Sequence, residues 1–233
     1  MGEKVALVTG GNRGIGLETV RLLAQEGIKT ILGSRNPKLG EEAVHQLKKK
    51  GLSATPLELD VTSLESIRKA RGVVEKKFGR LDILINNAAV YLDENKKLHE
   101  LEDGIFVETL HSNLVGPLNL CREFIPLMKR HRYGQIVNLS SGMGESRSLT
   151  AGSGAYKISK YALNALTRVL ADEVDARHIK INSVCPGWVR TRMGGPNAVL
   201  SPKESAEGVV WAALLPETGP SGKFFRYKKI IDW

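Results

Sequence analysis

A tyrosine and a lysine four residues apart carry the clearest chemistry in this sequence. Tyr156 and Lys160 lie in a segment that predicts a helix beginning near Ala155, and side chains with this spacing share one helix face. An ammonium group beside a phenol favours the phenolate and lowers the pKa of the tyrosine from about 10 towards neutrality. Such a tyrosine can give a proton to a carbonyl or take one from an alcohol. Because the same spacing is common on ordinary amphipathic helices, the pair indicates a function only together with other groups.

Two serines offer a partner for this pair. Ser140 and Ser141 close a predicted buried strand at residues 135–140, and Ser141 precedes Tyr156 by fifteen residues. A hydroxyl at this place could hydrogen-bond a substrate carbonyl and stabilise the charge that develops on its oxygen. The alternative is a small hydroxyl that only satisfies the end of a strand.

A glycine-rich loop at residues 9–16, TGGNRGIG, follows the apolar run at residues 5–8 and precedes a helical pattern. Glycine admits positive φ and lets a ligand approach the main chain, and a helix start presents unpaired N–H groups to a phosphate. Leu17 and Glu18 stand where a P-loop needs Lys and Ser or Thr, so that kind of loop is excluded. The loop indicates a nucleotide site, with a tight packing turn as the alternative.

Two arginines indicate which nucleotide. A site that prefers NAD places Asp or Glu near the end of the second strand, where it holds ribose hydroxyls. This sequence has Gly33-Ser34-Arg35 there, without an acid, and Arg13 lies inside the glycine loop. Arginine binds phosphate through charge-assisted hydrogen bonds. The pair predicts NADP(H), although either arginine alone would be read as a solvated surface charge.

The elements that position these residues alternate between strand and helix. About seven strands are expected, at residues 5–8, 28–33, 54–59, 82–86, 135–140, 180–185 and 222–227. A long helix is expected to contain Asn113 and to run to about Lys129. The alternation predicts a single α/β domain over residues 1–233, a doubly wound parallel sheet with helices on both faces. The candidate residues follow strand ends, which is where such sheets bind ligands.

Composition excludes several other classes. The 233 residues carry a net charge of +9, but the basic residues are dispersed among acids and only 6% of residues are aromatic, so no nucleic-acid partner is expected. No apolar run approaches the ~18 residues of a membrane span, so no membrane partner is expected either. Two cysteines, Cys121 and Cys185, are too few for a zinc site or a disulfide framework. We therefore expect no metal and a cytoplasmic location.

Taken in order, the glycine loop, Asn-Asn-Ala, Ser-Ser, Y-x-x-x-K and Pro-Gly resemble the short-chain dehydrogenase/reductase family. The C-terminal third is most similar to the NADPH-dependent carbonyl reductases of that family. The resemblance implies a Rossmann-like fold and four catalytic residues. Tyr156 would be the general acid/base, Ser141 would polarise the carbonyl, and Lys160 would depress the tyrosine pKa and hold the nicotinamide ribose. Asn113 would position a water for proton relay. Ser141 fits the family's spacing to Gly144 better than Ser140 does.

The resemblance also implies where cofactor and substrate bind. NADP(H) would contact Gly10, Asn12, Arg13, Gly14, Ile15, Gly16, Ser34, Arg35, Asn36, Asp60, Val61, Asn87, Ala88, Tyr156, Lys160, Pro186, Gly187, Val189 and Thr191. Substrate loops are expected near residues 142–155 and 188–200, the latter short enough for an open site. The chain lacks the long insert that animal carbonyl reductases carry before the tyrosine. The resemblance also implies a homodimer or a homotetramer.

The leading hypothesis is a reversible, NADPH-dependent reduction of aldehyde and ketone carbonyls to alcohols, acting on a small-molecule substrate. Within enzymes, the alternative is a 3-oxoacyl carrier-protein reductase, because a basic surface could receive an acidic carrier. The alternative of another class is a non-catalytic NADPH-binding sensor or scaffold. Relatives of that kind tend to lose the tyrosine or the lysine, and both are present here.

Overall fold

The structure is a computed structural model that describes residues 3–233, so the first two residues of the predicted domain lie outside it. Strands and helices alternate along most of the chain. The strands are β1 (Val5–Val8), β2 (Lys29–Ser34), β3 (Ala54–Glu58), β4 (Ile83–Asn86), β5 (Gly134–Leu139), β6 (Ile179–Cys185), β7 (Phe224–Arg226) and β8 (Lys229–Ile231). The α-helices are α1 (Gly14–Gln25), α2 (Pro37–Lys49), α3 (Leu64–Phe78), α4 (Ile105–Leu110), α5 (Gly116–Arg130), α6 (Gly154–Glu173) and α7 (Pro202–Ala213).

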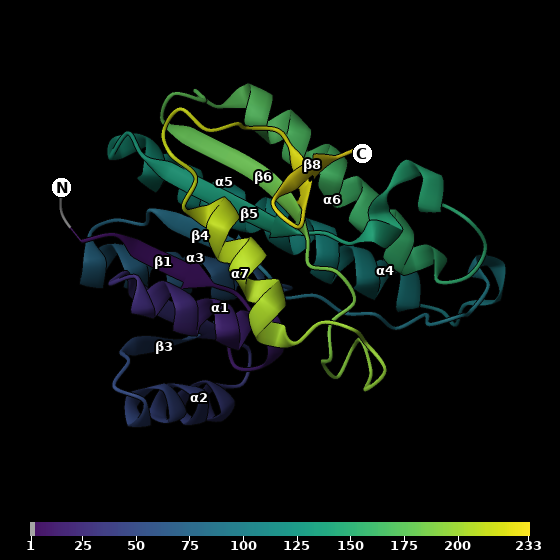
Figure 1. The fold of residues 1–233 in the computed structure, drawn as a ribbon, viewed down its shortest axis with the longest axis horizontal. Coiled ribbons are helices and arrows are strands. Elements are labelled where there is room, and N and C mark those ends of the chain that lie inside the picture. The colour runs from purple at the N-terminus through teal and green to yellow at the C-terminus, as the bar shows by residue number, and fades with distance from the viewer. Residues whose placement is uncertain (1–2) are drawn as a thin grey trace.

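The strands form one sheet in the order β3-β2-β1-β4-β5-β6-β7-β8 (Figure 1). Neighbours from β3 to β7 pair in parallel, and β8 pairs antiparallel with β7. The predicted doubly wound α/β fold is confirmed. The chain order reverses between the adjacent strands β1 and β4, and in such sheets the crevice at this point binds ligands.

Strand β8 is the one strand that the sequence pattern did not predict. It follows a turn in which Tyr227 and Lys228 both have positive φ, 50° and 62°. Hairpin turns of this kind normally carry Asn or Gly, because those residues tolerate positive φ. With a tyrosine and a lysine in the turn, nothing in the sequence marked the return of the chain.

Helices cover both faces of the sheet (Figure 1). On one face, α3, α5 and α6 bury apolar side chains against the strands, among them Ile67, Phe124 and Leu170. On the other face α1, α2 and α7 do the same, for example with Leu23 and Leu47. These two buried layers hold the strand ends in place, and the candidate residues stand on those ends. No helix of residues 3–233 is both long enough and apolar enough to cross a membrane.

Candidate active site

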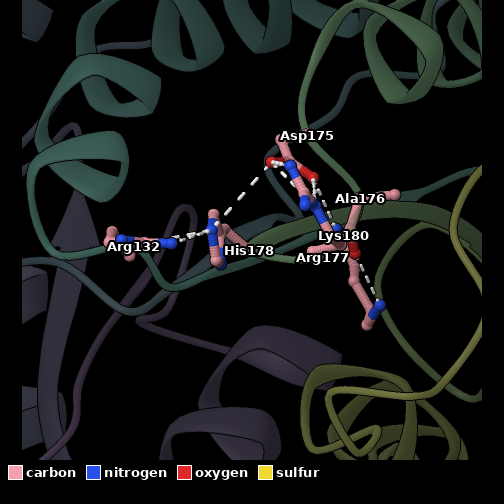
Figure 2. Close-up of polar contacts among 6 residues, drawn as sticks. All are labelled: Arg132, Asp175, Ala176, Arg177, His178 and Lys180. Atoms are coloured by element: carbon pink, nitrogen blue, oxygen red, sulfur yellow. Dashed lines mark hydrogen bonds and ion pairs between the residues drawn. The ribbon is translucent and has the colours of Figure 1, made fainter.

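The two edges of the sheet carry different polar groups. At the edge where β6 begins, Arg177 pairs with Asp175 at 2.7 Å and Arg132 donates to Nε2 of His178 at 3.0 Å (Figure 2). The network ties surface loops together. The candidate residues lie at the opposite edge, where the parallel strands end.

Tyr156 and Lys160 occupy the first two turns of α6 and are both buried, with 7% and 3% of their surface exposed. Lys160 Nζ donates to the main-chain oxygen of Leu139, the last residue of β5, at 2.8 Å. The same Nζ lies 5.7 Å from the centre of the Tyr156 ring. The structure therefore brings the two side chains together at the end of β5, as the spacing predicted.

The electrostatics of this pair differ from the sequence-based prediction. Burial raises the pKa of Tyr156, and a hydrogen bond with Ser141 opposes that rise only in part. Burial also lowers the pKa of Lys160 to about 8. The expected lowering of the tyrosine pKa is wrong in this structure, because desolvation of the phenol outweighs the effect of a lysine whose amine is bonded to Leu139.

The two candidate serines have different surroundings. Ser140 is buried, and its hydroxyl donates to the main-chain oxygen of Lys160 at 3.3 Å. Ser141 is less buried and lies beside Tyr156, and its hydroxyl accepts the amide of Met143 at 3.1 Å. Only the hydroxyl of Ser141 is placed to share a substrate oxygen with the phenol, so the geometry favours Ser141 over Ser140.

Asn113 lies in the predicted long helix, which runs on to Arg130 but is not α-helical throughout. A π-helical turn at His111–Val115 separates α4 from α5. The Asn113 side chain accepts the amide of Val90 at 2.8 Å and donates to its carbonyl at 2.9 Å. It also donates to the Ser159 hydroxyl at 3.1 Å. The Asn113 side chain therefore holds the main chain of the segment after β4 in place. Short π-helical turns of this kind are frequent at functional sites.

The glycine loop is held by the residues after β4. Main-chain amides of Asn87 and Ala88 donate to the Thr9 hydroxyl at 3.0 and 2.9 Å. The Asn87 side chain donates to the carbonyls of Thr9 and Gly10 at 2.8 and 3.2 Å. A Cβ on Gly16 would clash with the main-chain oxygen of Gly10, so no larger residue fits there. Asn12 and Ile15 complete the loop and are half-buried.

We expect Gly16→Ala to weaken NADPH binding and to lower the free energy of unfolding by about 1–3 kcal/mol, because a main-chain contact must open. Gly72→Ala is the matched control, since a Cβ there meets nothing within 4 Å on the surface of α3. In a helix this change should raise stability, by up to about 1 kcal/mol. Thermal unfolding followed without a dye measures the stability of each variant, and a fluorescence titration with NADPH measures its binding. If Gly16→Ala binds NADPH as tightly as Gly72→Ala does, the close approach of the dinucleotide to the glycine loop is contradicted.

Three arginines gather beside the glycine loop. Partial burial and the neighbouring charges of Arg192 and Arg35 lower the pKa of Arg13. Within residues 3–233 no carboxylate forms an ion pair with any of the three. Unneutralised like charges at one place favour an anionic ligand. Arg192 is not among the residues predicted from the sequence, because nothing in its spacing shows that the turn after β6 folds back onto this loop.

The turn after β6 contacts the glycine loop. A Cβ on Gly14 would lie 3.3 Å from Cγ2 of Thr191, and the Thr191 hydroxyl accepts the amide of Gly194 at 3.1 Å. Gly187 has φ 79° and continues the turn from Pro186, whereas Val189 is buried and bridges to Leu200. The predicted nicotinamide turn and the predicted phosphate loop are therefore neighbours in space.

Of four further predicted cofactor residues, Ser34, Asn36 and Asp60 have local hydrogen bonds and Val61 is buried. The Ser34 hydroxyl donates to the Asn36 carbonyl at 2.8 Å, and the Asn36 side chain caps α2 at Leu39. The Asp60 carboxylate accepts the Thr62 amide at 2.9 Å, beside the buried Val61. These bonds shape the ends of β2 and β3, and a contact with cofactor stays a prediction for each.

The residues of the glycine loop and the neighbouring arginines fit a dinucleotide. The first amides of α1 have no acidic residue near them in the first turn, and Gly16 leaves room that a Cβ would fill. Cations for a phosphate stand at the same end of the sheet. The arrangement is therefore suited to hold a dinucleotide that carries an additional phosphate.

The chain belongs to the short chain dehydrogenase family, whose family model matches residues 4–198. The resemblance found in the sequence is thus confirmed. This membership supports an oxidoreductase.

Among individual proteins, the chain is 35% identical to the human (Homo sapiens) protein named carbonyl reductase [NADPH] 1, over 280 aligned positions that cover 100% of this chain and 99% of the relative. It is 34% identical to the protein of the same name from Sus scrofa, covering 99% and 94%. Because these alignments are longer than this chain, the relatives carry residues that it lacks, in agreement with the missing insert.

Two solved structures share the fold. Salutaridine reductase from Papaver somniferum is 29% identical with a TM-score of 0.84, covering 96% of this chain and 99% of that one. A variant of actinorhodin polyketide ketoreductase with NADPH is 26% identical with a TM-score of 0.88, covering 97% and 95%.

Proposed function

We propose that this protein reduces aldehydes or ketones to alcohols with NADPH, and that Tyr156 supplies the proton. The observation that carries the proposal is the meeting of the Tyr156 phenol, the Ser141 hydroxyl and the Lys160 amine at the end of β5. The relatives at 34–35% identity are named as NADPH carbonyl reductases, which favours this reaction over reduction of a carrier-bound 3-oxoacyl group.

The residues divide the work of the reaction. When bound, the cofactor supplies the hydride, and the substrate carbon must lie next to the cradle formed by the glycine loop and the turn after β6. Ser141 donates a hydrogen bond to the carbonyl oxygen and stabilises its developing charge. Tyr156, kept protonated by burial, gives its proton to that oxygen. Lys160 supports the phenolate that remains, because its ammonium is the cation nearest to the phenol among these catalytic groups.

The test is NADPH oxidation across a panel of aldehydes, ketones and one 3-oxoacyl thioester. We expect oxidation with at least one aldehyde or ketone. Activity with the thioester alone would favour the carrier-protein alternative. NADPH binding without oxidation by any carbonyl would favour a sensor or scaffold and would contradict the proposal.

The rate of reduction should fall at high pH. Burial lowers the pKa of Lys160 from 10.5 to about 8 and raises that of Tyr156, so the lysine loses its proton first as the pH rises. Between pH values of about 8 and 10.5 the folded protein therefore binds fewer protons than the unfolded chain, so the burial of Lys160 opposes folding less as the pH rises through that window. The phenolate loses its cation in the same window. We expect kcat/KM to decline about tenfold per pH unit above about 8. A profile that stays level to pH 10 or so would contradict this role of Lys160.

A further inference from the structure

The start of α6 is capped by a distant residue and not by its own N-cap. Ser153, which precedes the helix, has φ 57°, and its side chain makes no capping bond. The carboxylate of Asp93, in the segment after β4, stands in its place. Asp93 Oδ2 accepts the amide of Ala155 at 2.7 Å, and Oδ1 accepts the amide of Tyr156 itself at 3.3 Å.

The same segment contacts the Tyr156 ring and is itself held by neighbouring residues. The ring of Tyr91 lies 4.5 Å from the ring of Tyr156, measured between centroids, and its hydroxyl bonds with Ser153 at 2.7 Å. Residue Val90 is held at both main-chain groups by the Asn113 side chain. The main chain and the ring of Tyr156 are therefore tied through residues 90–95 to the π turn.

If Asp93 only stabilised the helix, a buried carboxylate would be an unusual cap. Its side chain is fully buried, with 0% exposed, and its hydrogen-bond partners at α6 are main-chain amides instead of a cation. A buried carboxylate is costly unless it is well bonded, and neutral Ser or Asn cap helices equally well. What a carboxylate adds is stronger, charge-assisted bonds and a favourable interaction with the helix dipole.

We propose that Asp93 is a positioning residue, which fixes the main chain at Tyr156 so that the phenol stays beside Ser141. Its effect on turnover rests on the proposed function. Its effect on the phenol does not, because that side chain can be observed without any substrate.

The test compares Asp93→Ala, which removes both acceptors, with Asp93→Asn, which keeps one. Misplacement of a catalytic group by a remote change can lower the rate about a hundredfold, so we expect Asp93→Ala to lower kcat by roughly tenfold to a hundredfold. The Kd for NADPH should be nearly unchanged, and Asp93→Asn should recover much of the rate. In a Tyr156→Phe background, Asp93→Ala should cost little more, because the group it positions is already gone. A wild-type kcat, or equal losses in both backgrounds, would overturn the proposal.

Asp82→Ala is the matched control. Asp82 is also 0% exposed, but it lies at the other edge of the sheet, where it accepts the Val5 amide at 2.8 Å and pairs with Arg80 at 2.6 Å. It should lower thermal stability without lowering kcat in the folded protein. A loss of kcat equal to that of Asp93→Ala would mean that any buried carboxylate matters alike, and would overturn the proposal.

An ultraviolet titration separates this proposal from the proposed function. The difference between each protein and its Tyr156→Phe counterpart reports ionisation of the Tyr156 phenol. Loosening the start of α6 admits water, so the phenol should ionise at lower pH in Asp93→Ala than in the wild type. An unchanged titration overturns the positioning role even if carbonyls are reduced. A wild type that reduces no carbonyl overturns the proposed function alone.

Discussion

Tyr156→Phe is expected to lower the turnover number for carbonyl reduction by roughly 10²–10⁴-fold, because general acid catalysis is worth about that much. The change removes one oxygen from a buried ring and leaves the Tyr91 ring contact in place. The affinity for NADPH should therefore stay near the wild-type value. Initial rates of NADPH oxidation, with NADPH binding followed separately by fluorescence, measure both quantities.

Tyr161→Phe is the matched control for that result. Tyr161 lies on the same helix, but 40% of its surface is exposed and no hydrogen bond holds its hydroxyl within residues 3–233. Its turnover number should equal that of the wild type. Full activity in Tyr156→Phe, or an equal loss in both variants, would remove the tyrosine from the mechanism.

Arg35→Ala is expected to weaken NADPH binding about tenfold to a hundredfold and to leave NADH binding nearly unchanged. A charge-assisted hydrogen bond is worth about 1.5–3 kcal/mol, which corresponds to that range in Kd. Arg35 interacts with Arg13, and no carboxylate pairs with either in the described chain, so the lost charge is one that a phosphate would have neutralised. Parallel titrations with NADPH and NADH measure the selectivity.

Arg168→Ala serves as the control for charge alone, since Arg168 is an exposed arginine on α6 and not near the glycine loop. It should change neither affinity. If Arg35→Ala weakens NADPH and NADH equally, the arginine does not recognise the additional phosphate and the preference for NADP(H) fails.

The elements that depend on local pattern could be predicted from the sequence. Strand β1 has the predicted bounds Val5–Val8, and the other expected strands fall within two residues of their observed ends, because buried parallel strands are short apolar runs between turn residues. Tyr156 and Lys160 share a helix face as their spacing required. The glycine loop stands between β1 and α1 as predicted.

What the sequence did not reveal depends on contacts between distant segments. The π turn at His111–Val115 carries no glycine or proline that would mark it in the sequence, and the structure packs it against α4, α5 and α6. In the sequence, Asp93 is one of several polar residues in a predicted loop. Its role as the cap of α6 becomes visible in the folded structure. Arg192 meets Arg13 because the turn after β6 folds over the glycine loop. The raised pKa of Tyr156 reflects burial, which spacing along a helix does not report.

The central claim is that this chain moves hydride from NADPH to a carbonyl carbon with Tyr156 as the proton donor. Its most direct test uses NADPH deuterated at nicotinamide C4, as separate 4R and 4S forms, with a carbonyl that the panel has found to be reduced. Mass spectrometry of the alcohol should find deuterium on the former carbonyl carbon with one of the two forms, and Tyr156→Phe should form that labelled alcohol at a rate lower by roughly 10²–10⁴-fold. Alcohol without deuterium from either form, or labelled alcohol formed equally fast by Tyr156→Phe, would contradict the claim.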